Sequence, residues 1–130
     1  MVPEATAADT IKIAPGNYTL TSTLNLLQPV VITALDPANR PVITSTASDV
    51  ILVNSDDVTI SRLAFEMGLT STTGLRGIVA NAGDFDGLII SNNIFESVNP
   101  ISGTPNTNLV WGGFAISLVS AAGDVQNVTI

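Results

Sequence analysis

Residues Asp56–Glu66 read DDVTISRLAFE, and thirty residues later Asp86–Glu96 read DGLIISNNIFE. Asp, Ile, Ser, Phe and Glu recur at the same places in both segments. A fixed repeat of this length, built on short apolar runs, is typical of a chain that stacks one structural unit on the next. The repeat therefore predicts a solenoid.

The same register continues in both directions along the chain. Gln28–Thr33 (QPVVIT) lies twenty-eight residues before Asp56–Ser61, and Gln126–Ile130 (QNVTI) lies forty residues after Asp86–Ile90. We expect the extra residues of the longer step to fall in one connection, so that the strands keep their order. A second series of short apolar runs accompanies the first, at Leu24–Leu27, Val50–Asn54, Ile78–Asn81 and Leu118–Ala121.

These runs have the character of short β-strands. They are rich in Val, Ile, Leu and Thr and are bounded by Gly, Pro, Asn and Asp, as strands are. Val58–Ile60 and Val128–Ile130 alternate apolar and polar residues, so one side of each run faces a core. Seven prolines spread along the chain disfavour long helices. Equivalent residues of successive coils would lie roughly 4.8 Å apart, which predicts the stacks Ile60 on Ile90, Phe65 on Phe95, and Val58 on Leu88.

The chain also resembles a known group of proteins. Asp9–Thr19 (DTIKIAPGNYT) is similar to the first coil of right-handed parallel β-helix proteins of the pectin-lyase-like superfamily. Val58–Ser61 and Ile90–Phe95 resemble the parallel β-helix repeats of that group, and the likeness covers nearly the whole chain. It implies an all-β fold, a right-handed parallel β-helix solenoid of about four coils. Residues 1–130 would form one such domain, either by themselves or as part of a longer β-helix.

The resemblance says more about fold than about activity. The superfamily includes polysaccharide lyases, glycoside hydrolases, phage tailspikes, adhesins and non-enzymatic surface proteins. An extracellular or cell-surface location follows from the resemblance alone, because Met1–Glu4 has neither the basic start nor the apolar stretch of a signal peptide.

Composition excludes several kinds of partner and chemistry. The net charge is −7, and the four basic residues are widely spread, so neither nucleic acid nor an anionic membrane surface is expected as a partner. No apolar run approaches the roughly 18 residues of a membrane-inserted helix. The absence of cysteine excludes disulfides and thiolate metal sites. The absence of histidine removes the commonest general base.

The two ends of the solenoid are predicted to be uncapped. A solenoid exposes an apolar cross-section and unpaired strand edges at each end unless a capping unit covers them. Met1–Ala8 is too short for a stable helical cap, and Ile130 falls inside a strand that repeats Val58–Ile60. Two interpretations stay open: the chain continues into further β-helix coils, or copies of the chain stack head to tail into a filament.

Two long connections are the candidate ligand-binding region. Met67–Arg76 and Ser97–Gly113 occupy the same place in successive coils, so they should lie on one flank, and functional residues often sit on such loops. A sugar ring can stack on Trp111, the only tryptophan, while amide groups bind its hydroxyls; the alternative is that the indole packs against the flank. The candidate residues for binding a polysaccharide are Trp111, Asn106, Asn108 and Arg76.

Paired carboxylates are the candidate metal site. Glu66 and Glu96 repeat in register, and so do Asp56 and Asp86. Carboxylates placed in this way bind a hard cation such as Ca²⁺, share a proton, or point apart into water. A calcium site takes about six or more oxygen ligands, and these four side chains supply only part of one. Ca²⁺ is the one cofactor that the sequence suggests.

No catalytic residue is assigned. Catalysis requires an acid and a base within reach of one substrate, and no strand carries a basic residue flanked by carboxylates on neighbouring coils. Arg62 beside Glu66 is interpreted as a surface ion pair.

The sequence therefore favours a non-enzymatic, extracellular or surface-exposed structural module that assembles end to end through open β edges. The alternatives are the N-terminal, non-catalytic section of a secreted polysaccharide lyase or glycoside hydrolase, and a carbohydrate-binding adhesin segment.

Overall fold

The protein is described by a computed structural model that places residues 9–45, 49–68, 76–80, 85–98, 115–118 and 129–130. These residues contain no helix, and every strand pair among them is parallel. The strands are β1 Asp9–Ile13, β2 Asn17–Leu20, β3 Leu24–Leu26, β4 Val30–Ala34, β5 Val42–Ser45, β6 Asp49–Val53, β7 Thr59–Ser61, β8 Ala64–Gly68, β9 Arg76–Ala80, β10 Ile89–Ser91, β11 Ile94–Val98 and β12 Ile116–Leu118.

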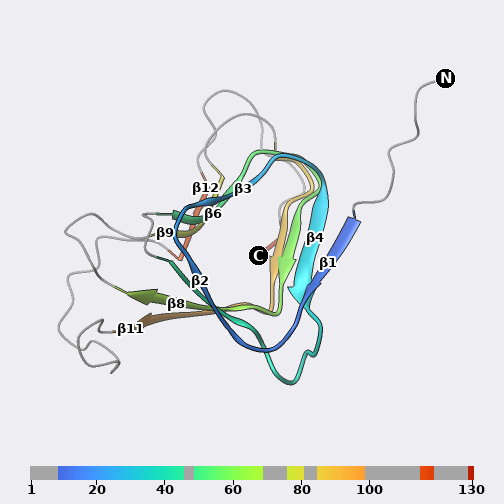
Figure 1. Cartoon of the computed structure of the whole chain (residues 1–130). Helices are drawn as coiled ribbons and strands as arrows, with labels where there is room; N and C mark the ends of the chain where they lie inside the picture. Colours follow the sequence, from blue (N-terminus) through green and yellow to red (C-terminus); the bar gives the residue numbers. More distant parts are fainter. Residues whose placement is uncertain (1–8, 46–48, 69–75, 81–84, 99–114, 119–128) are drawn as a thin grey trace.

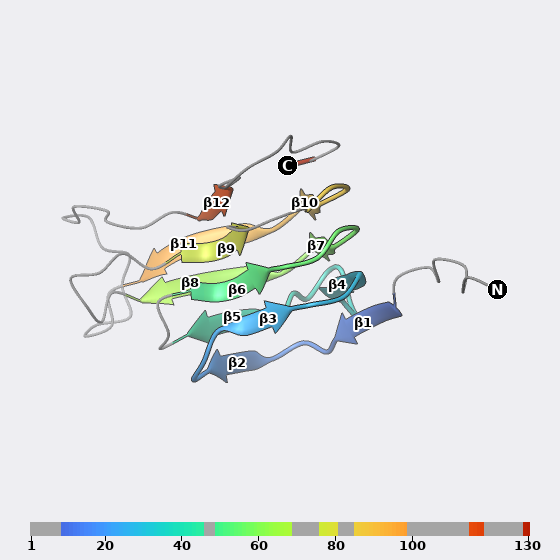
Figure 2. The same cartoon turned by 90° about the horizontal axis from the view of Figure 1, so that it is seen from above.

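The strands form three four-stranded sheets that the chain visits in turn. The orders are β1-β4-β7-β10, β2-β5-β8-β11 and β3-β6-β9-β12, so each set of three consecutive strands makes one coil. Figure 1 views the coils nearly end-on, and Figure 2 shows them stacked on one another. In Figure 1 the chain turns clockwise as it recedes from the first coil, which is the right-handed sense. The predicted parallel β-helix of about four coils is confirmed.

Rows of like side chains fill the interior. Ile32, Ile60 and Ile90 align across β4, β7 and β10, and all three are almost fully buried. The rings of Phe65 and Phe95 stack with centroids 4.9 Å apart and planes 8° apart. The predicted stacks of Ile60 on Ile90 and of Phe65 on Phe95 are confirmed. Each fully buried side chain of this size contributes roughly 1.5–3 kcal/mol through the hydrophobic effect.

Each copy of the repeated segment is bent in the middle, which the repeat did not predict. DDVTISRLAFE supplies β7 and β8, and these strands belong to different sheets. Arg62 and Asn92 follow β7 and β10 directly, and their φ values are 60° and 55°. A left-handed residue turns the chain sharply, and asparagine adopts that conformation more readily than most residues. These two residues therefore form the corner between the first and second sheets.

An asparagine side chain holds this corner to the next coil. Asn93 Nδ2 donates a hydrogen bond of 2.9 Å to the carbonyl oxygen of Ile60. The backbone N–H of Leu63 donates to Asn93 Oδ1 over 3.0 Å. Asn93 thus satisfies backbone groups of the preceding coil at a bend, where strand pairing is interrupted.

The register of the third sheet differs from the sequence-based alignment. Leu118–Ala121 was expected over Ile78–Asn81, but Ile116 is the residue paired with Ile78. In the same sheet Leu24 pairs with Ile51, and Ile51 pairs with Ile78. The connections that precede the strands of this sheet differ in length between coils. A constant residue spacing between coils therefore does not predict the register of this sheet. Residues 1–8 and 119–128 lie outside the described part of the chain, and the prediction of uncapped ends stays a prediction.

Candidate functional site

The first coil presents three edge strands at one end of the solenoid. Among the described strands, β1, β2 and β3 each stand at the end of their sheet and pair on one side only. An edge strand carries a row of backbone N–H and C=O groups that can pair with another strand. The three edge strands lie together at one end of the stack, because they belong to the same coil (Figure 2).

Three apolar side chains on these edge strands are far more exposed than their partners one coil further in. Ile11 is 51% exposed while its partner Ile32 is 3% exposed. Leu24 is 41% exposed and its partner Ile51 is 2% exposed. Tyr18 is 38% exposed, and it too belongs to an interior row, since it pairs with the buried Ile43. The first coil therefore continues the interior rows without completing their burial.

A hollow of about 130 Å³ lies among side chains of the first two coils and Leu63 of the third. A gap of this kind leaves its lining atoms without the packing contacts of a filled core. Its lining includes Ile13, Tyr18, Leu20, Leu24, Ile32 and Ile43. The edge strands, the exposed apolar residues and the hollow together form what we call the first-coil face, defined by Ile11, Ile13, Tyr18, Leu20 and Leu24.

The opposite end of the solenoid carries matching rows. Among the named strands, the three rows that begin at Ile11, Tyr18 and Leu24 run to Ile90, Phe95 and Ile116 of the fourth coil. Phe95 and Ile116 are partly buried at this end, whereas Ile90 is 2% exposed.

Sequence reasoning missed the first-coil residues as functional candidates. Their signal was present, because Ile11, Tyr18 and Leu24 alternate with polar neighbours in the way that buried strand residues do. What the sequence could not show was which row each of them joins.

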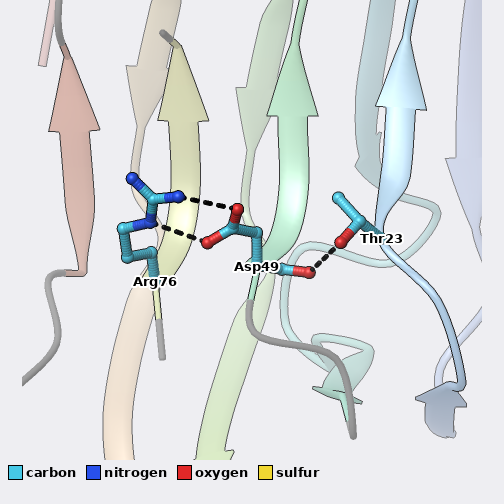
Figure 3. Close-up of polar contacts among 3 residues, drawn as sticks. All are labelled: Thr23, Asp49 and Arg76. Carbon is cyan, nitrogen blue, oxygen red and sulfur yellow. Dashed lines mark hydrogen bonds and ion pairs between the residues drawn. The ribbon is translucent and has the colours of Figure 1, made fainter. Parts of the chain in front are cut away.

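Arg76 does not lie on a loop, as the sequence analysis placed it, but begins β9. Its guanidinium makes two parallel hydrogen bonds to Asp49, Nε to Oδ1 over 2.7 Å and Nη2 to Oδ2 over 2.9 Å (Figure 3). Thr23 Oγ1 donates to the carbonyl oxygen of Asp49 over 2.8 Å, so three successive coils are joined (Figure 3). The hydrogen bonding of the guanidinium to the Asp49 carboxylate raises the pKa of Arg76, against the lowering effect of burial.

This ion pair has a structural explanation. Asp49 and Arg76 are register partners at the first residues of β6 and β9. Bidentate pairing of arginine with a carboxylate fixes geometry as well as charge. The contact therefore fixes where two strands begin, while a role of Arg76 in ligand binding stays a prediction.

The two predicted carboxylate pairs differ in how the fold arranges them. Glu66 and Glu96 are register partners in β8 and β11, as expected. Asp56 instead accepts a hydrogen bond, because the backbone N–H of Asp86 donates to its Oδ1 over 2.9 Å. Within the described residues no three acidic side chains gather closely enough to hold a metal ion. Asp56 thus has a role in joining successive turns, and Ca²⁺ binding stays a prediction.

The remaining expectations have mixed outcomes. Trp111, Asn106 and Asn108 lie outside the described residues. The ion pair expected between Arg62 and Glu66 is not formed in the described part of the chain, where the salt bridge present is that of Asp49. Arg62 uses its backbone N–H for a hydrogen bond to the carbonyl oxygen of Ser91.

Among the placed residues there is no helix with the length and hydrophobicity needed to cross a membrane. In comparisons with known proteins, the chain matches no protein-family model, no curated protein sequence and no solved structure at a significant level.

Proposed function

We propose that this protein is a structural β-helix module that associates end to end, with the first-coil face of one copy seated on the last coil of another. The observation that carries the proposal is the exposure of Ile11, Tyr18 and Leu24, which belong to rows that are buried in the second and third coils. A second copy can complete these rows with the same side chains that complete them inside the chain.

The chemistry of the two ends supports a copy of the chain as the partner. Continuing each row by one step would place Ile11 on Ile90 and Leu24 on Ile116. These are the pairings of aliphatic residues that the internal coils already make. Because the two surfaces differ, the contact is head to tail, and repeating it produces a filament rather than a closed dimer.

Burial of the exposed part of each side chain would contribute roughly 1 kcal/mol, about half the value for a fully buried residue. The three edge strands would add backbone hydrogen bonds worth about 0.5–1.5 kcal/mol each. This total is suited to an association that depends on protein concentration. An extracellular or surface location, and membership of the pectin-lyase-like superfamily, form part of the same proposal and are supported by the residues of the first coil and the repeats.

The test compares three forms of the chain by sedimentation velocity over a concentration series, without added ligand. The natural sequence is expected to form species larger than one copy as the concentration rises. Leu24→Glu places a charge in the first-coil face and should keep the chain monomeric. Thr59→Glu is the matched control, because Thr59 lies in the third coil, in β7, away from both ends.

A natural sequence that stays monomeric at every concentration would overturn the proposal. Equal association of the Leu24→Glu and Thr59→Glu chains would also overturn it, since the contact would then lie elsewhere.

A further inference from the structure

The described chain already places one residue of a further coil on the last complete one. Thr129 pairs in parallel with Ile89 of β10. Its backbone N–H donates to the carbonyl oxygen of Leu88 over 2.9 Å, and its own carbonyl accepts from the N–H of Ile90 over 2.8 Å. Thr129 therefore occupies part of the edge of β10 that a following coil needs.

The first strand of the solenoid carries the same pair of residues in the same order. Thr10–Ile11 in β1 and Thr129–Ile130 both read Thr-Ile. Thr10 belongs to the row that continues through Val31 and Thr59 to Ile89. A first coil stacked on the fourth coil in this register would therefore bring Thr10 opposite Ile89, which is the place that Thr129 holds.

We infer that two segments compete for the free edge of β10 in one copy: the Thr129 segment of that same copy, and β1 of a neighbouring copy. This inference rests on the proposed function, because it assigns a regulating element to the same end-to-end contact. A single strand edge pairs with one strand at a time. Stacking of copies in register therefore requires Thr129 to release Ile89, and Thr129 restrains the association.

The difference in strand length favours replacement of Thr129 by β1 of a second copy. β1 offers five residues, Asp9–Ile13, whereas Thr129 makes an isolated bridge. The incoming strand would replace the two hydrogen bonds of Thr129 and would cover Ile11, which is 51% exposed in the single chain. At low concentration the intramolecular segment holds the edge, since it is always nearby, and at high concentration β1 of a second copy displaces it.

The experiment uses Thr129→Pro in the full chain. Proline has no backbone N–H, so it cannot donate to Leu88, and the bridge is weakened. Thr129→Val is the matched control, because valine keeps both the N–H and the β-branched shape. A chain shortened by residues 129–130 serves as a second variant. Sedimentation velocity gives the concentration at which half of each chain is associated.

We expect Thr129→Pro, which loses one hydrogen bond, and the shortened chain, which loses both, to associate at about tenfold lower concentration than the natural chain or below. Thr129→Val should associate as the natural chain does. Adding Leu24→Glu to Thr129→Pro should return the chain to a monomer, because the contact still uses the first-coil face.

The outcomes separate this inference from the proposed function. If Thr129→Pro and the shortened chain associate no more readily than the natural chain, while Leu24→Glu still prevents association, the competition is wrong and the proposed function stands. If Leu24→Glu fails to prevent association of Thr129→Pro, or if no form associates, both are wrong.

Discussion

Replacing Asn93 by alanine tests whether one side chain stabilises the corner between two coils. Asn93 accepts a hydrogen bond from the N–H of Leu63 at 3.0 Å and donates one to the carbonyl of Ile60 at 2.9 Å. Leu63 is 1% exposed and Ile60 is fully buried, so water cannot readily replace the lost partner. A buried donor left without an acceptor costs about 1–3 kcal/mol. We expect a loss of about 2 kcal/mol in the free energy of unfolding.

Asn93→Asp separates the two hydrogen bonds. The carboxylate can still accept from Leu63, but it cannot donate to Ile60 and faces that carbonyl instead. The loss should be about 1 kcal/mol or more, since one bond is removed and a repulsion is added. Asn25→Ala is the control, because Asn25 is exposed on β3, and exposed substitutions usually change stability by less than about 0.5 kcal/mol.

Urea denaturation followed by circular dichroism gives the comparison. If the slope of the unfolding free energy against urea concentration is unchanged, the shift of the unfolding midpoint reports the change in stability directly. The reasoning would be refuted if Asn93→Ala lost no more stability than Asn25→Ala.

Two further experiments test the corner residue Arg62 and the ion pair of Asp49 with Arg76. Arg62→Gly should stabilise the chain by about 0.5–1 kcal/mol in the same assay, since glycine adopts the observed φ of 60° without penalty, while Arg62→Ala, which keeps the penalty, should not. A double-mutant cycle of Asp49→Ala and Arg76→Ala should give a coupling of about 0.5–1 kcal/mol that weakens at high salt, because the side chains are 14% and 31% exposed. A coupling that does not change with salt would contradict the electrostatic explanation of this contact.

Much of the fold could be predicted from the repeat, because each residue in a solenoid stacks on the equivalent residue of the next coil. Ile60 and Ile90, or Phe65 and Phe95, meet because the same residue types recur at a fixed spacing. This spacing failed in the third sheet, where Ile116 rather than Leu118 pairs with Ile78. There the strands follow connections of unequal length, and the length of a connection does not determine where the next strand starts to pair.

The candidate site was less predictable than the fold. The sequence indicated open β edges, but it did not identify Ile11, Tyr18 and Leu24 as the exposed members of buried rows. Exposure of a residue depends on whether another coil covers it, and this is a property of the assembled stack. Arg76 was misplaced for a related reason, since its partner Asp49 comes from the preceding coil.

The sequence by itself determined that short strands of like residues stack in parallel, because a repeated pattern of side chains buries its apolar members only against its own copies. The tertiary structure alone decided where the chain bends, at Arg62 and Asn92, and which strand edge Thr129 occupies. These features depend on hydrogen bonds between residues of different coils, and the pattern along one coil does not specify them.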